Sequence, residues 1–397
     1  MSLAERDMGS IERAHKARLD LTQDGGEFAD VVVNQRIDND WSRVFEIFNL
    51  DAEDFVVVDD TVRVSTWQQS ARAANGDRDL IQLWSYSARF KRKPKAALSE
   101  ADIEAHRAEV RSWNIRRNAT ENGSDGTPVS AIINLADIQG GKSEGGGVAA
   151  TSQRLRDGLV NVQTWLDRVR QYRNVAELVL VNNGDPLEGC AGNYAAQLFT
   201  VQLNLRGQMN FVLDHWLLYA RELFPQFDQA RFVSVLCNHG EFSRLGTNKN
   251  QTSDSDNAGG FLAETLQRVL DRPEFSHVEW TVPHDQMNVY ADVSGIPVAF
   301  NHGHKIPGND GAPAFEKWLN GQVRGDAEAH RAKIWLTAHK HHFACWDLGS
   351  CTTIQMPSLD GGSKWLRDMT GRYSRSGIVA LLVGEHDRMG WSDLAFL

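Results

Sequence analysis

The sequence predicts an α/β protein in which buried strands alternate with helices. After about residue 126, short apolar runs alternate with longer helical stretches, a pattern typical of strands covered on both faces. Hydrophobic residues make up 41% and charged residues 24% of the 397 residues, as in ordinary globular proteins. At roughly 150 residues per domain, this length indicates two or three domains.

The N-terminal part carries short β-like runs and one short amphipathic helix. Strands are expected over 30–34, 55–58, 61–66 and 80–90, and the helix over 40–48. A further helix is expected from Ser99 to about residue 117, because Ser99 and Asp102 form a capping-box pattern.

The turn-forming residues of 122–128 indicate a linker. We therefore predict a small mixed α+β accessory domain over 1–125, of no recognisable family, and a second domain over 126–397. In the second domain, strands are expected over 129–135, 178–181, 232–236, 296–300, 334–337 and 378–383, and helices over 151–173, 193–223, 259–270 and 313–320. Ligands of such sheets bind at the carboxyl ends of the strands.

Charge and cysteine content exclude several classes of protein. The net charge of −10 is unlike that of a protein that coats nucleic acid, although a local basic groove is still compatible with it. No apolar run reaches the roughly 18 residues that a membrane helix needs, and the N-terminus lacks the apolar core of a secretory signal. The four cysteines form no CxxC pair. We expect a reduced, cytoplasmic protein with no membrane partner; the sequence leaves its oligomeric state open.

Polar side chains follow five successive predicted strands. They form the ordered set D-x-Q, GD, NH, HGH and H-x-H, and its members are Asp137, Gln139, Asp185, Asn238, His239, His302, His304, His339 and His341. Carboxylate, amide and imidazole groups suit Mn²⁺, Fe or Zn²⁺. Each motif alone also occurs as an ordinary cap, turn or surface histidine, but the ordered set favours a metal centre.

This order of motifs resembles the calcineurin-like metallophosphoesterase superfamily over about residues 129–345. The resemblance implies a β-sandwich flanked by helices (α/β/β/α), two divalent metal ions, with Mn²⁺ expected first and Fe or Zn²⁺ as alternatives, and hydrolysis of a phosphate ester by a metal-activated water. It also implies a role for each motif residue. Asp137 and His341 would hold the first metal, Asp185 would bridge, Asn238, His302 and His339 would hold the second, and His239 would protonate the leaving oxygen.

The sequence departs from the family pattern at four positions. Gln139 stands where the family usually has His, and an amide oxygen is a weaker ligand than imidazole, so the first metal site is expected to be weaker. The same Asp-x-Gln version occurs in a manganese-dependent ADP-ribose/CDP-alcohol pyrophosphatase branch. Cys237 and Ala338 replace glycines of the pattern, and Gly240 is inserted before Glu241.

Three further residues are candidates for contacting the substrate. The glycine-rich stretch 140–147 lacks the spacing of a P-loop and is expected to form a flexible loop beside the site. Lys142 in this loop, Arg244 after the third motif and His304 could each contact a substrate phosphate, although an ordinary solvent-exposed role is equally compatible with the sequence.

Three substrate hypotheses stay open. A nuclease would use the basic run 89–95, with Trp84, Tyr86, Phe90 and Trp113 nearby, to hold DNA or RNA by charge and stacking, unless these aromatics pack a small core. The whole chain is also similar to phosphoesterases encoded by tailed phages, among which nucleases are common. A small-nucleotide phosphodiesterase or pyrophosphatase fits Gln139 and the acidic charge. A non-catalytic metal-binding interaction module is the third hypothesis.

Overall fold

The chain forms two compact units, Met1–Ala96 and Ala97–Leu397. This division comes earlier than the boundary predicted at residue 125, because Val110 of helix α3 (Glu100–Ser112) packs into the core of the second unit. The computed structural model describes residues 17–22, 25–52, 55–72, 78–92, 98–117, 126–189, 200–242, 255–307, 311–362, 367–368, 371 and 373–397.

The first unit is a small antiparallel sheet with one short helix, α2 (Ser42–Ile47), as the sequence predicts. The strands are β1 (Arg18–Thr22), β2 (Gly25–Val33), β3 (Phe55–Val57), β4 (Arg63–Arg72) and β5 (Arg78–Arg92), and β5 pairs with β2, β3 and β4. Aromatic side chains make its core, since Phe28, Phe45, Tyr86 and Phe90 are almost fully buried. This packing confirms the alternative in which Tyr86 and Phe90 build a core.

The second unit contains two sheets. The larger sheet has the order β16-β15-β6-β7-β8-β9, in which β6 to β9 are parallel and β15 and β16 are added antiparallel. Its strands are β6 (Pro128–Leu135), β7 (Asn174–Asn182), β8 (Gln229–Ser234), β9 (Val278–Thr281), β15 (Val379–Val383) and β16 (Trp391–Phe396).

The smaller sheet has the order β10-β11-β12-β14-β13, with β11, β12 and β14 parallel. Its strands are β10 (Val289–Val293), β11 (Ile296–Phe300), β12 (Ile334–Thr337), β13 (Ala344–Asp347) and β14 (Thr352–Gln355). The antiparallel strands β10 and β13 form its two edges.

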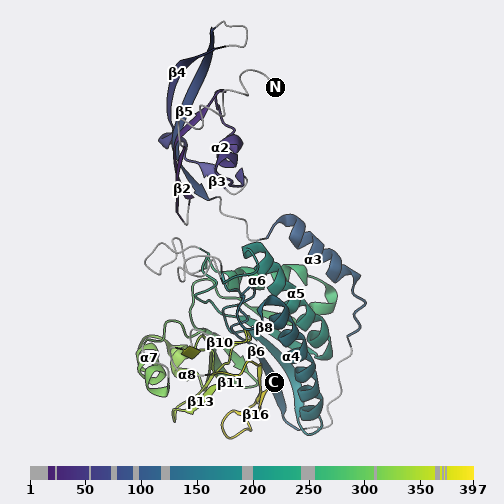
Figure 1. Cartoon of the computed structure of the whole chain (residues 1–397). Coiled ribbons are helices and arrows are strands. Elements are labelled where there is room, and N and C mark those ends of the chain that lie inside the picture. Colours follow the sequence, from purple (N-terminus) through teal and green to yellow (C-terminus); the bar gives the residue numbers. More distant parts are fainter. Residues whose placement is uncertain are drawn as a thin grey trace. The chain divides into compact units, whose positions relative to one another are not determined.

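Alternating side chains of the central strands build two cores, because successive residues of a strand point to opposite faces. In β6, Ile133 faces a core shared with helices, while Ile132 faces the other sheet. Helices α4 (Gly147–Arg170), α5 (Leu205–Leu223) and α6 (Ala258–Val269) cover the larger sheet, and α7 (Ala312–Gly325) and α8 (Ala327–Arg331) pack on Trp335 of the smaller one (Figure 1). The layers are therefore α/β/β/α, and the predicted fold class is confirmed.

Local signals set several helix ends. Ser99 and Asp102 form the predicted capping box of α3, although this helix ends at Ser112 and not near residue 117. Helix α5 begins at Leu205, later than the predicted residue 193, because the Asn204 side chain accepts a hydrogen bond from the Gly207 backbone N–H and caps the helix there. No helix in the described part of the chain is long and apolar enough to cross a membrane.

Candidate metal centre

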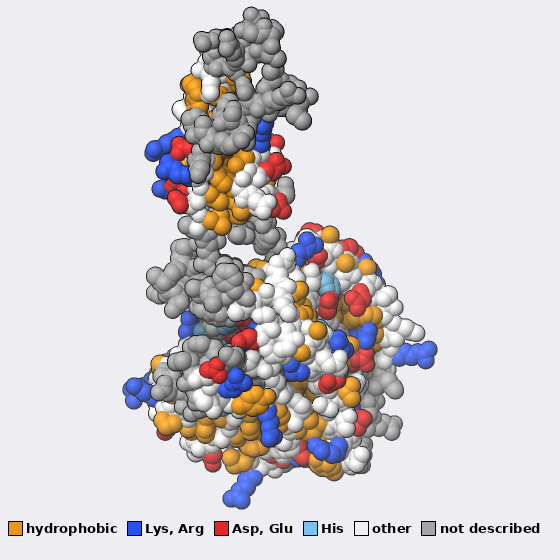
Figure 2. Space-filling view, in the orientation of Figure 1, with side chains coloured by type: hydrophobic (Ala, Val, Ile, Leu, Met, Phe, Trp, Pro, Cys, Tyr) orange, Lys and Arg blue, Asp and Glu red, His pale blue; other side chains and the backbone are white. Residues whose placement is uncertain are grey.

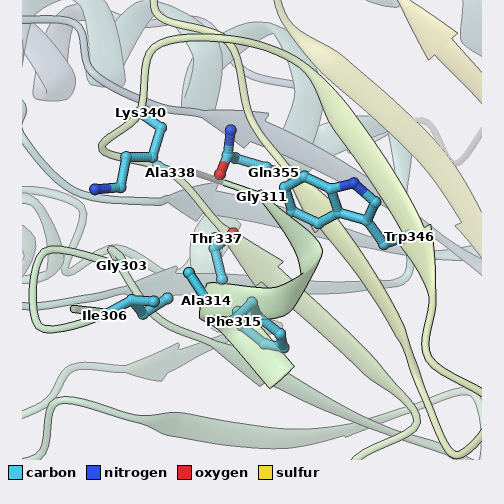
Figure 3. A pocket seen from close by; sticks show the side chains of 10 residues that line it. All are labelled: Gly303, Ile306, Gly311, Ala314, Phe315, Thr337, Ala338, Lys340, Trp346 and Gln355. Atoms are coloured by element: carbon cyan, nitrogen blue, oxygen red, sulfur yellow. The ribbon is translucent and has the colours of Figure 1, made fainter. Parts of the chain in front are cut away.

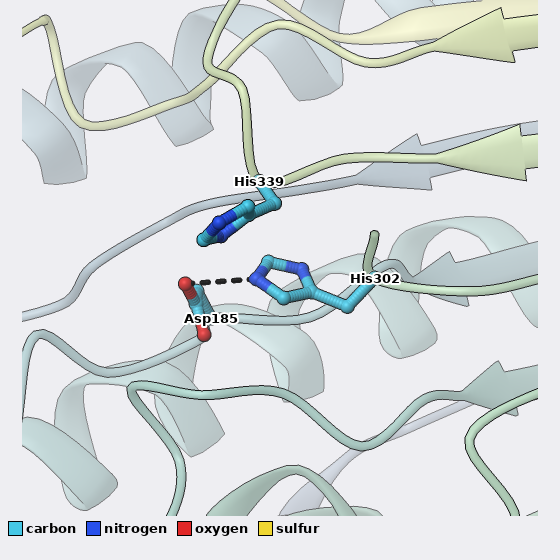
Figure 4. A group of neighbouring side chains, drawn as sticks. All are labelled: Asp185, His302 and His339. Carbon is cyan, nitrogen blue, oxygen red and sulfur yellow. Dashed lines mark ion pairs between the residues drawn. The ribbon is translucent and has the colours of Figure 1, made fainter. Parts of the chain in front are cut away.

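Four predicted ligands from both sheets meet in a group that we call the second position. Asp185 follows β7, Asn238 follows β8, and His302 and His339 follow β11 and β12. His302 Nε2 lies 2.9 Å from Asp185 Oδ2 and 3.0 Å from Asn238 Oδ1. The rings of His302 and His339 are 5.1 Å apart between centroids, and both point toward Asp185 (Figure 4).

The second position fits a divalent cation. Asp185, His302 and His339 can each offer one ligand atom, and these atoms lie within 4.8 Å of one another. Asp185 is fully buried, and its Oδ2 lies 2.9 Å from an imidazole nitrogen, His302 Nε2. A buried carboxylate oxygen of this kind needs a cation partner, and a donor set of carboxylate, amide and imidazole suits Mn²⁺, Fe or Zn²⁺.

Neighbouring backbone groups hold the ligands of the second position. His302 Nδ1 lies 3.0 Å from the carbonyl oxygen of Asn183, so its N–H donates there and Nε2 faces the ligand group. Gly184 has a φ of 98°, and a Cβ atom at this position would lie 2.3 Å from His302 Nδ1. The Gly-Asp motif therefore has a steric reason, because only glycine allows His302 to approach.

Asp137, Gln139 and His341 form a neighbouring group that we call the first position. Asp137 Oδ1 lies 3.3 Å from His341 Nε2, and Asp137 Oδ2 accepts a hydrogen bond from the His339 backbone N–H at 3.0 Å. Gln139 Nε2 lies 3.2 Å from His341 Nε2, while Gln139 Oε1 accepts a hydrogen bond from Lys142 Nζ at 2.9 Å. The amide oxygen of Gln139 thus already has a cationic partner.

Lys142 and Asp360 form a buried ion pair beside the first position. Lys142 is 6% exposed and Asp360 is fully buried, and Lys142 Nζ lies 2.5 Å from Asp360 Oδ2. Asp360 Oδ2 is also 3.6 Å from His341 Nδ1. Burial alone would raise the pKa of Asp360, but the charges of His341 and Lys142 hold it well below its usual range.

Sequence reasoning missed Asp360. It follows β14, a strand whose residues Thr352–Gln355 do not form an apolar run. The available signal was its place five residues after a strand, since Asp137 and Asp185 also follow strands, by two and three residues. The stretch 140–142 differs from the predicted flexible loop, because it is buried and bridges to Leu187 and Val201.

The backbone of the centre carries strain. Asp137, Gln139, Asp185, His339 and His341 all have φ between 44° and 71°, in the left-handed region. Each such residue costs on the order of 1–3 kcal/mol and persists only where the surrounding structure imposes it, most often at functional sites. This observation is independent of the motif order and points to the same residues.

His239 is tied to the second position through Asp185. Its backbone N–H donates to Asp185 Oδ1 at 2.9 Å, and its Nδ1 lies 2.8 Å from the carbonyl oxygen of Glu188. Two departures of this loop from the family pattern go together, Cys237 and Gly240. A Cβ atom at position 240 would lie 2.7 Å from Cys237 Sγ. The larger residue at 237 is therefore accommodated by the glycine at 240.

The remaining predicted substrate contacts differ in placement. The His304 ring lies 5.5 Å from that of His302 and 6.3 Å from that of His339, beside the second position. A hollow lined in part by Gly303, Ala338 and Lys340, the chain neighbours of these ligands, is shown in Figure 3. Arg244 lies outside the described residues.

No protein-family model and no curated protein matches the sequence. Solved structures with a similar fold include an uncharacterised protein described as a phosphoesterase from Streptococcus pneumoniae (11% identity, 65% of this chain and 84% of that chain, TM-score 0.27). Others are an archaeal phosphodiesterase (11% identity, 67% and 99%, TM-score 0.31) and Vps29 from Entamoeba histolytica complexed with Zn²⁺ (11% identity, 67% and 98%, TM-score 0.23). At these values, the likenesses do not bear on activity. The layers of the second unit themselves confirm the fold that the calcineurin-like metallophosphoesterase resemblance implies.

Proposed function

We propose that the second unit is a metal-dependent phosphoesterase that hydrolyses phosphodiester bonds. The convergence of Asp185 Oδ2 and Asn238 Oδ1 on His302 Nε2, with His239 tied to the same Asp185, is the observation that carries the proposal. This arrangement supports a site in which a cation and a proton donor both reach the same phosphate group of a substrate.

A bound divalent ion would supply charge neutralisation for the phosphate and a lower pKa for a coordinated water. The chain's own residues supply the rest of the chemistry. Asn238 is a neutral ligand, so it leaves more of the cation's charge for phosphate oxygen than a carboxylate would. As an imidazolium, His239 would donate its Nδ1–H to the Glu188 carbonyl, which orients the ring, and would carry on Nε2 the proton for the leaving oxygen.

Nucleic acid is the finer part of the proposal, and the exposed Lys91 of the basic run supports it. Tyr86 and Phe90 are buried, and Trp113 packs against Phe275 in the second unit, so these side chains do not support a stacking platform. Lys91 is exposed, but Arg89 lies 3.6 Å from Glu27, and Figure 2 shows acidic as well as basic side chains on the first unit. Residues 93–95 of the basic run lie outside the described residues.

The test of the reaction class is hydrolysis of bis-p-nitrophenyl phosphate by the full chain with Mn²⁺, before and after chelation. We expect turnover that needs the metal and is lost in Asp185→Asn. Metal binding without turnover on any phosphodiester would instead support the non-catalytic module.

The test of the substrate uses linear DNA, RNA and small nucleotides with the same protein. A nuclease should lose activity on polymer steeply as salt rises, because released counterions contribute to binding. Neutralising Lys91, Arg92 and Lys93 together should weaken activity on polymer alone. If cleavage is confined to small nucleotides or pyrophosphates, the alternative small-nucleotide function is correct.

A further inference from the structure

We infer that the ammonium group of Lys142 takes the place of the first metal ion, so that the centre binds a single divalent ion at the second position. The inference rests on the metal centre of the proposed function, but it does not depend on which ester is cleaved. It departs from the two-metal centre that the sequence resemblance implies.

The position of the ammonium group is the first observation. Lys142 Nζ is buried between Gln139 Oε1, at 2.9 Å, and Asp360 Oδ2, at 2.5 Å. Gln139 belongs to the first position and Asp360 lies 3.6 Å from His341. A cation supplied by the chain is therefore already hydrogen-bonded to a group that the metal would need.

The orientation of Gln139 is the second observation. An amide coordinates a metal through its oxygen, but here the oxygen faces Lys142 and the nitrogen lies 3.2 Å from His341 Nε2. The oxygen that would coordinate a metal therefore accepts a hydrogen bond from the ammonium group of Lys142. Gln139 is thus a partner of Lys142, and the first position lacks one of its expected ligands.

The ligand groups of the two positions are the third observation. In the part of the chain that the structure describes, the ligand atoms of Asp185, His302 and His339 gather within 4.8 Å, whereas Asp137 and His341 belong to no such group of three. A divalent ion at the first position would also lie near the buried charge of Lys142. Like charges in a buried site repel strongly, so this ion would bind much more weakly than one at the second position.

The experiment counts metal ions. The full-length protein is stripped with a chelator, dialysed to equilibrium against Mn²⁺, and analysed by mass spectrometry for manganese per chain. Electron paramagnetic resonance of the same samples distinguishes an isolated Mn²⁺ from a coupled pair. We expect one ion per chain and an uncoupled spectrum for the wild-type protein.

Two variants test the cause. Lys142→Met combined with Gln139→His removes the ammonium and restores the imidazole, and it should bind two ions with a coupled spectrum. An unpaired, buried Asp360 could prevent this variant from folding. Asp360→Asn is therefore added to Lys142→Met and Gln139→His in a second variant, in which neither member of the former ion pair is charged. Arg173→Met is the matched control, because it removes the cation of another partly buried ion pair, with Asp387, at the opposite end of β7.

The outcomes separate this inference from the proposed function. Two ions of similar affinity in the wild-type protein would overturn the inference, even if the protein hydrolyses phosphodiesters. The inference would also be overturned if the folded variants that combine Lys142→Met with Gln139→His still bound one ion per chain. One ion in the wild type and two in those variants would support it, whether or not turnover is detected.

Discussion

The two halves of the centre are built alike in backbone but differ in charge. Three of the five left-handed site residues, Asp137, Gln139 and His341, belong to the first position, so both halves carry the strain of a constructed site. Among the described residues, Asp185 at the second position pairs with the imidazole of His302 and with no lysine or arginine. The first position has a cation of the chain, because Lys142 reaches Gln139 and Asp360. A shared order of motifs therefore does not fix the number of metal ions.

The largest effect is expected for Asp185→Asn, which acts on the second position. Asp185 Oδ2 is the buried carboxylate oxygen nearest His302, and loss of partners that only orient a ligand already costs roughly 10–100-fold. We expect hydrolysis to fall to background and the metal content to fall with it, as measured on the purified variant. Asp393→Asn is the control, because Asp393 is also a left-handed aspartate but lies in β16. An Asp185→Asn protein with unchanged metal would show that Asp185 is not a ligand.

A smaller and substrate-dependent effect is expected for His239→Ala. The variant should retain its metal but lose about 10²–10⁴-fold in turnover on esters with alkyl leaving groups, which need a proton. Esters of p-nitrophenol should suffer less, because their leaving group is stable as an anion. His330→Ala, at an exposed position of α8, is the control. Equal losses on the two kinds of ester would mean that His239 is not the acid.

The sequence predicted the parts of the molecule that local pattern determines. The strands and the polar residues that follow them were found because apolar runs and their polar ends are contiguous in the chain. The pairing of Lys142 with Asp360 was not predicted, because it joins residues far apart in sequence, and a lysine in a glycine-rich stretch is ordinarily exposed. The burial of Tyr86 and Phe90 was predictable from the sequence. Together with Ala88 they form a run of apolar residues at alternate positions, which places all three on one face of a strand.

The two halves should also differ in protonation when metal is removed. Burial alone would lower the pKa of His341, but the charges of Asp137 and Asp360 outweigh it and raise the pKa to about 9. Burial, and then the charge of His302, lowers the pKa of His339 to about 2. In chelated protein at pH 6–8, ¹⁵N NMR should therefore show a charged His341 and a neutral His339.

The signs of the two contributions to stability are opposite. The contribution of His341 is complete below its ordinary pKa of about 6.5 and is lost as pH rises through about 9. The contribution of His339 declines as pH falls below about 6.5, because the unfolded chain then binds a proton that the folded chain does not. If the ring signals of His341 and His339 both titrate near pH 6.5, the two positions do not differ in protonation.

The smallest effect is expected for Gln139→His alone, measured as the Mn²⁺ concentration that gives half-maximal activity. Imidazole is a better ligand than an amide, but Lys142 would keep its 2.5 Å contact with Asp360 and its charge beside the new ligand. The Mn²⁺ requirement should therefore move little in this variant. With Lys142→Met also present, the same histidine should lower the requirement further, and the coupling between the two changes should be about 0.5–3 kcal/mol, as for residues in direct contact. Effects of the two substitutions that simply add would mean that Lys142 does not compete with a metal for the first position.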